Sequence, residues 1–164
     1  MSAEAGAQNI SFSDSTEQAF AKTLGKYPNK RAALLPTLRL AQDEFGYLTN
    51  DVMEYVAERL ELPPSKVLQV ATFYTMFYKR PHGRFHIEVC TSVPCCMMGG
   101  YDIMRHLESR LGIKAGEVSE DGKFSFAEAE CLAGCGHAPL CQVNSEYHEF
   151  LTPDSLDEIL EALK

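Results

Sequence analysis

Apolar residues recur at helical spacing through the first half of the chain. Residues 15–18 have the S-x-x-Q spacing of a capping box, which predicts a short helix that ends near residue 24. A second helix is predicted over 30–45, where four apolar side chains share one face: Leu34, Leu38, Ala41 and Phe45. Pro36 within this segment predicts a kink or a later helix start, and Gly46 predicts the end.

Two further helices are predicted in the same half. Polar residues 49–51 offer N-caps for a third helix, whose inward positions are Val52, Val56 and Leu60. The pair Pro63-Pro64 stops this helix and opens a fourth, predicted over 65–77. Four amphipathic helices with short joints predict a small antiparallel bundle over residues 15–80, preceded by a flexible tail over 1–14.

The pattern changes near Pro81, where the boundary between two domains is expected at about residues 79–84. Phe85, Ile87 and Val89 alternate with polar residues and predict a strand that ends at Cys90. The rest of the sequence predicts a helix at residues 100–111, a strand at 123–130 and a hairpin whose strands lie at 140–143 and 147–150. A last helix is predicted after its cap at Thr152-Pro153. The order β-α-β-β-β-α predicts a compact α/β domain over 84–164, and the whole chain is expected to be α+β.

Composition narrows the class of protein. The formal net charge of −8 in 164 residues leaves no basic stripe for nucleic acid. No apolar run approaches the roughly 20 residues that span a bilayer, so no direct membrane insertion is expected. Residues 1–14 have neither the basic nor the apolar region of a secretory signal, so a reducing, cytoplasmic location is expected. In such a compartment, six cysteines favour metal or redox chemistry over disulfides.

Four cysteines form two pairs that follow predicted strands. Cys90 and Cys95 are spaced C-x4-C, and Cys131 and Cys135 are spaced C-x3-C. A [2Fe-2S] cluster needs four thiolates, but a structural zinc site would use the same ligands, and the spacing does not distinguish them. Disulfides are disfavoured without a secretion signal, and a thioredoxin-type redox enzyme is disfavoured because no C-x-x-C is present.

Nearby glycines and the two remaining cysteines also bear on the site. Gly99-Gly100, Gly134 and Gly136 are expected to let backbone N–H groups approach the sulfurs closely. Cys96 and Cys141 are expected to be small buried or half-buried residues, although Cys96 adjoins Cys95 and offers an alternative ligand.

The cysteine runs resemble the signature of the NuoE family, the thioredoxin-like [2Fe-2S] subunits of respiratory complex I. The run Cys90-Thr-Ser-Val-Pro-Cys95 is similar to its first half, and Glu130-Cys-Leu-Ala-Gly-Cys135-Gly-His-Ala-Pro139 to its second half. The resemblance extends upstream through the run at residues 67–77 and covers roughly residues 15–163. It implies a helical bundle followed by a thioredoxin-like domain over 84–164.

The resemblance also implies a site and partners. The cluster ligands would be Cys90, Cys95, Cys131 and Cys135, and one [2Fe-2S] cluster would exchange single electrons with FMN in a partner subunit. That partner, of the NuoF type, would bind FMN and NADH within the peripheral arm of a membrane-bound NADH:quinone oxidoreductase. This chain carries no G-x-G-x-x-G after a strand and no Walker loop, so it is expected to have no NADH dehydrogenase activity alone. Related NAD-linked hydrogenases and formate dehydrogenases remain alternative assemblies.

Overall fold

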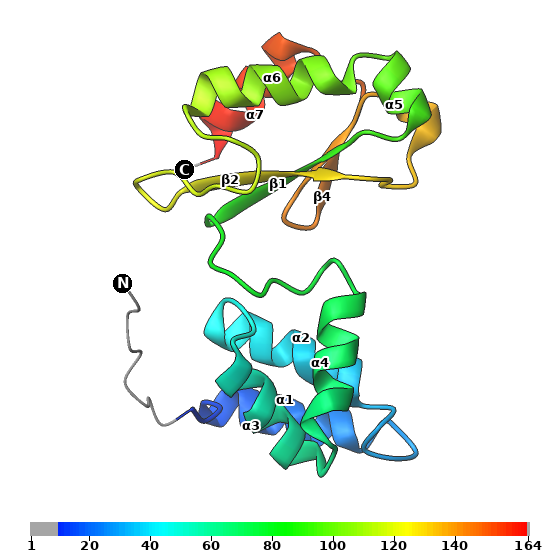
Figure 1. The fold of residues 1–164 in the computed structure, drawn as a ribbon, viewed down its shortest axis with the longest axis vertical. Coiled ribbons are helices and arrows are strands. Elements are labelled where there is room, and N and C mark those ends of the chain that lie inside the picture. The colour runs from blue at the N-terminus through cyan, green and yellow to red at the C-terminus, as the bar shows by residue number, and fades with distance from the viewer. Residues whose placement is uncertain (1–9, 164) are drawn as a thin grey trace. The chain divides into compact units, whose positions relative to one another are not determined.

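The computed structural model describes residues 10–163 and has the predicted α+β class. Contacts divide the chain into two compact units, one that ends at Pro81 and one that begins at His82. The first unit is helical and the second contains all four strands found among the described residues (Figure 1). No helix within residues 10–163 has both the length and the apolar character that crossing a membrane requires.

The helical unit packs four helices around one apolar core. They are α1 (Asp14–Leu24), α2 (Leu34–Phe45), α3 (Asn50–Leu60) and α4 (Pro64–Phe73). Each of the first three turns an apolar stripe inward, as the helical spacing predicts: Leu38, Val56 and Leu60 are fully buried. Arg59 of α3 joins this helix to α1, because its guanidinium donates to both carboxylate oxygens of Glu17.

Helix ends differ from the predictions for identifiable reasons. Ser13, not Ser15, caps α1, since its Oγ accepts a hydrogen bond from the Thr16 N–H at 3.4 Å. Helix α2 begins at Leu34, so Pro36 lies in the first turn, where no backbone N–H is needed within the helix; the later start is confirmed. Helix α4 ends at Phe73 rather than at 77, because Tyr74 is extended and Phe77 turns into the core.

The flexible tail predicted over residues 1–14 extends too far towards residue 14. Its residues 1–9 lie outside the described part of the chain. Phe12, however, is buried, and its ring lies 5.0 Å from the Tyr55 ring and 5.8 Å from the Phe20 ring. An aromatic side chain placed among the helices in this way belongs to the bundle.

The second unit is a four-stranded sheet with helices. Its elements, in chain order, are β1 (Phe85–Cys90), α5 (Val93–Met97), α6 (Gly100–Leu111), β2 (Phe124–Ala129), η1 (Cys135–His137), β3 (Cys141–Val143), β4 (Glu146–His148) and α7 (Pro153–Ala162). The strand order is β2-β1-β3-β4, with β1 and β2 parallel and the other pairs antiparallel. The predicted order of strands and long helices is confirmed, whereas the short helices α5 and η1 were not predicted.

One face of the sheet carries the core of this unit. Helices α6 and α7 lie side by side over that face (Figure 1). Ile87 and Val89 point into this core from β1, together with Leu107 of α6 and Leu156 of α7. His86, on the opposite face, is only 8% exposed, and its Nδ1 lies 2.7 Å from the Oγ of the buried Ser125.

Candidate metal centre

The parallel pairing of β1 and β2 brings the two cysteine loops to one end of the sheet. In this register Cys90 lies opposite Ala129, and Cys131 follows two residues later. Parallel neighbours end at the same edge and are about 4.8 Å apart. Two cysteine pairs that are 36 residues or more apart in the sequence therefore emerge from adjacent strands.

The first pair is enclosed in apolar side chains. Cys90 is 1% exposed and Cys95 is fully buried, and both pack against Leu140 and Ala138. Helix α5 makes this possible, because its single turn folds the chain back so that Cys95 faces Cys90. Burial, followed by the adjacent Cys90 thiol, raises the pKa of Cys95 above its ordinary value.

Hydrogen bonds at Cys90 favour a negative sulfur. Burial acts to raise the pKa of this thiol, but hydrogen bonding with the Ser92 side chain and with the backbone of Leu132 and Ser92 outweighs it and lowers the pKa. The Ser92 Oγ lies 3.4 Å from the Cys90 Sγ. Leu132 is informative, because it belongs to the second cysteine loop and packs against the apolar cluster that contains Cys90 and Cys95.

The second pair lies on the exposed side of the same end. Cys131 and Cys135 are both solvent-exposed, and the Ala133 N–H donates to the Cys131 Sγ at 3.3 Å. The loop turns sharply at Ala133, whose φ of 59° is left-handed, before the single turn of η1 at Cys135. A backbone donor thus reaches a sulfur of the second pair.

The four predicted ligands share one end of the sheet as unbridged thiols. Cys90 contacts Cys95 and the second loop packs on both, yet among residues 10–163 no three His, Cys, Asp or Glu side chains are arranged to hold a metal ion. The chemistry of the donor set nevertheless fits an iron–sulfur group. Four thiols, nearby backbone N–H donors and an apolar backing at Leu132 and Leu140 are what such a cluster requires.

Of the four glycines expected near the sulfurs, two have neighbours so close that a side chain would not fit. A Cβ on Gly100 would lie 2.9 Å from the Cys90 carbonyl oxygen and 3.0 Å from the Cys95 carbonyl oxygen. A Cβ on Gly134 would lie 2.9 Å from a Leu140 methyl carbon, whereas one on Gly136 would meet nothing within 4 Å. Gly99 serves another purpose, since it caps α6 with a left-handed φ of 98°.

Contacts that sequence patterns did not reveal hold the second loop in place. The Tyr147 hydroxyl donates to the Leu132 carbonyl oxygen at 3.1 Å, and the Phe150 N–H donates to the His137 carbonyl oxygen at 3.0 Å. The His137 Nδ1 also lies 3.3 Å from a Glu149 carboxylate oxygen. Tyr147 of β4 and the two residues that follow the strand, Glu149 and Phe150, therefore anchor the loop.

The two remaining cysteines have different surroundings. Cys141 is fully buried under the helices, and burial raises its pKa to about 12, as expected for a small core residue. Cys96 is exposed, which contradicts the expectation of a buried or half-buried side chain. On helix α5, successive residues point in different directions, so Cys95 faces Cys90 and Cys96 faces solvent.

Comparisons with known proteins agree with this picture. The family model of the thioredoxin-like [2Fe-2S] ferredoxins matches residues 20–164. The chain is 45% identical to the E-type subunit of the NADH-quinone oxidoreductase from Rickettsia bellii over 159 residues, which is 95% of both chains. It is 42% identical to the second E-type subunit of the same enzyme from Rhizobium meliloti over 139 residues, covering 85% of this chain and 83% of that one.

A solved structure has the same fold. An NAD+-reducing [NiFe]-hydrogenase in its air-oxidised state superposes with a TM-score of 0.65 at 23% identity. The match covers 79% of this chain but only 22% of the hydrogenase chain, so it shows a shared fold within a larger protein.

Proposed function

Because the chain belongs to the NuoE family of thioredoxin-like [2Fe-2S] ferredoxins, we propose that it is the electron-transfer subunit of an NADH:quinone oxidoreductase. Cys90, Cys95, Cys131 and Cys135 hold one [2Fe-2S] cluster in this proposal. Such a cluster, when bound, accepts and releases one electron at a time. The observation that supports the ligand set is the parallel register that places Cys131 two residues beyond the partner of Cys90.

The protein's own groups prepare the site for added negative charge. The Ala133 N–H donates to the Cys131 sulfur, and hydrogen bonding with Ser92 and with the Leu132 backbone lowers the pKa of Cys90 and so favours its anionic form. Donors to a sulfur favour the more negative state of an iron–sulfur site, so they favour reduction. Leu132 and Leu140 exclude water from the buried side, where Cys90 and Cys95 lie.

The partner in this proposal is a flavin subunit. NADH gives up two electrons as a hydride, and a flavin is the cofactor that divides them into single electrons. The partner would bind FMN and NADH, and the two subunits would lie in the peripheral, cytoplasmic arm of the complex. The isolated chain would be redox-active but would have no NADH dehydrogenase activity. NADH oxidation by the isolated chain without added flavin would refute this division of roles.

A serine series tests the ligand set. The chain is purified anaerobically, its iron, sulfide and zinc are measured, and an EPR spectrum is recorded after dithionite reduction. We expect a [2Fe-2S] signal that each single serine substitution at Cys90, Cys95, Cys131 or Cys135 weakens or abolishes. Cys96→Ser is the matched control for Cys95→Ser, and we expect it to keep the cluster content of the unaltered chain.

Two outcomes would overturn the proposal. Stoichiometric zinc with no EPR signal would favour a structural zinc site in an adaptor protein. Equal cluster loss from Cys95→Ser and Cys96→Ser would overturn the choice of ligand, because only the first sulfur contacts Cys90.

A further inference from the structure

Helix α4 leaves much of its apolar surface in solvent. It buries only Val67 and Ala71, while Leu68 is 46% and Phe73 is 76% exposed. Tyr74 continues this surface just beyond the helix. Single exposed apolar residues such as Leu68 are ordinary, but Phe73 and Tyr74 are adjacent and their rings lie 5.0 Å apart, which is typical of a patch that a partner covers.

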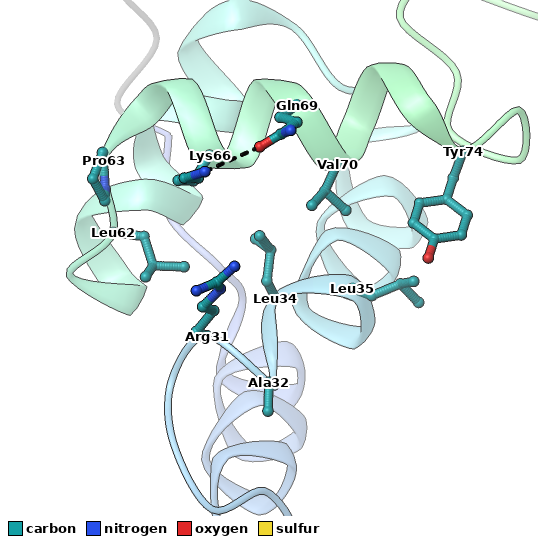
Figure 2. A pocket seen from close by; sticks show the side chains of 10 residues that line it. All are labelled: Arg31, Ala32, Leu34, Leu35, Leu62, Pro63, Lys66, Gln69, Val70 and Tyr74. Carbon is teal, nitrogen blue, oxygen red and sulfur yellow. Dashed lines mark hydrogen bonds between the residues drawn. The ribbon is translucent and has the colours of Figure 1, made fainter.

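This surface adjoins a groove within the helical unit. The groove has a volume of about 380 Å³ and lies between α4 and the start of α2. Figure 2 shows Leu34 and Leu35 reaching towards it from α2 and Val70 reaching towards it from α4, with Tyr74 at one end. Apolar side chains therefore form much of the wall, and the groove is large enough for one or two apolar side chains.

Two cations border the same groove. Arg31 and Lys66 line it, and its lining contains no Asp or Glu, although the whole chain has 23 acidic and 15 basic residues. Within the described residues neither cation forms an ion pair, and the Lys66 Nζ donates only to the Gln69 Oε1 at 3.3 Å. The adjacent Lys30, by contrast, is paired with Glu61 at 2.6 Å.

We propose that this groove, together with the exposed face of α4, binds a segment of another subunit that carries apolar side chains flanked by carboxylates. The apolar anchors would enter between Leu35 and Val70, and the carboxylates would meet Arg31 and Lys66. This inference rests on the proposed function only in taking the partner to be a subunit of the same complex. It assigns to the helical unit a docking role separate from the cysteine loops.

Charge and extent favour such a segment over other occupants. A second copy of this chain would also carry a net charge of −8, so two copies repel each other over most of their surfaces. A small amphipathic anion would fill the groove but leave Phe73 uncovered, because that side chain lies on the helix beyond the lining. A protein segment covers both the groove and the helix face.

Crosslinking in the assembled complex tests the occupant directly. Tyr74 is replaced by a photoreactive phenylalanine analogue, and the linked peptide is identified by mass spectrometry. Tyr27 is the matched control, since it is equally exposed at 39% and lies outside the groove. We expect a link from position 74, and not from position 27, to a peptide of another subunit with Asp or Glu near an apolar residue. A link only to a second copy, to a peptide without acidic residues, or to nothing in the assembled complex would overturn the proposal.

Charge reversal tests the contribution of the cations. The variant Arg31→Glu with Lys66→Glu is compared with Lys22→Glu with Lys114→Glu, which changes the net charge equally at exposed positions outside the groove. We expect the first variant to bind the complex that lacks this subunit at least about tenfold more weakly at low salt, and the second to bind within about threefold of the unaltered chain. Equal weakening by the two variants would refute the assignment. Both variants should keep the EPR signal, so failure here is distinguishable from failure of the proposed function.

Discussion

Replacing Gly100 by alanine should push the start of α6 away from the cysteine loop. The new Cβ would lie 2.9 Å from the Cys90 carbonyl oxygen and 3.0 Å from the Cys95 carbonyl oxygen. Ordinary contacts begin at about 3.4 Å, so one side must move by 3.4 − 2.9 = 0.5 Å. Both neighbours are backbone atoms, and the β1 backbone is further held by its pairing with β2, so neither yields cheaply.

Two effects of opposite sign determine how much the Gly100→Ala substitution changes the unfolding free energy. Overpacking of this kind costs about 1–3 kcal/mol. Alanine also restricts the unfolded chain, which stabilises the folded state by about 0.4–1 kcal/mol at a compatible position. Steric overlap wins, and we expect the unfolding free energy to fall by about 1–2 kcal/mol. The displaced loop carries Cys90 and Cys95, so cluster content should fall as well.

The second cysteine loop supplies matched controls. Gly136→Ala introduces a Cβ with nothing within 4 Å, so only the stabilising effect on the unfolded chain remains. Gly134→Ala meets side-chain carbons of Leu140 rather than backbone atoms, and its effect should fall between the other two. Denaturant unfolding ranks the unfolding free energies of the three variants, and their iron content is a second measurement. If Gly100→Ala were as stable as Gly136→Ala, the steric explanation of Gly100 would be wrong.

Three further predictions concern acid, an ion pair and the core. Burial and then the nearby His82 lower the pKa of His86 from 6.5 to about 4, so the unfolded state binds the proton first as the pH drops. The unfolding free energy should therefore fall by roughly 3 kcal/mol between pH 6.5 and pH 4, at about 1.36 kcal/mol per pKa unit. Urea titrations of His86→Gln should lack this pH dependence. Arg59→Lys loses the two-point contact with Glu17 and should lower the unfolding free energy by about 1 kcal/mol, and an unchanged melting temperature would contradict that reading. Leu107→Ala empties a fully buried position and should cost about 2–5 kcal/mol in the same titrations.

Local chemistry made much of the fold predictable. Helical spacing located the bundle helices, and the predicted cap at residues 49–51 is realised by Thr49, whose side chain accepts from the Val52 N–H. Alternation placed β1 at residues 85–90 as observed. Such signals depend on neighbours within a few residues, so the sequence alone contains them. Helix ends were less predictable, because Ser13 and Ser15 are equally suitable caps until Glu44, from another helix, accepts a hydrogen bond from the Ser13 hydroxyl.

The sequence by itself determined which residue types this protein brings to its site: two spaced pairs of thiols, the glycines beside them and the strands that precede them. Only the tertiary structure decided that β2 lies parallel to β1, that Cys95 rather than Cys96 faces Cys90, and that Leu132 of the second cysteine loop packs against the first pair. The reason is physical. Strand order, the direction of a side chain on a single helical turn and the approach of a distant loop are set by packing between segments far apart in the chain, and no local pattern encodes that packing.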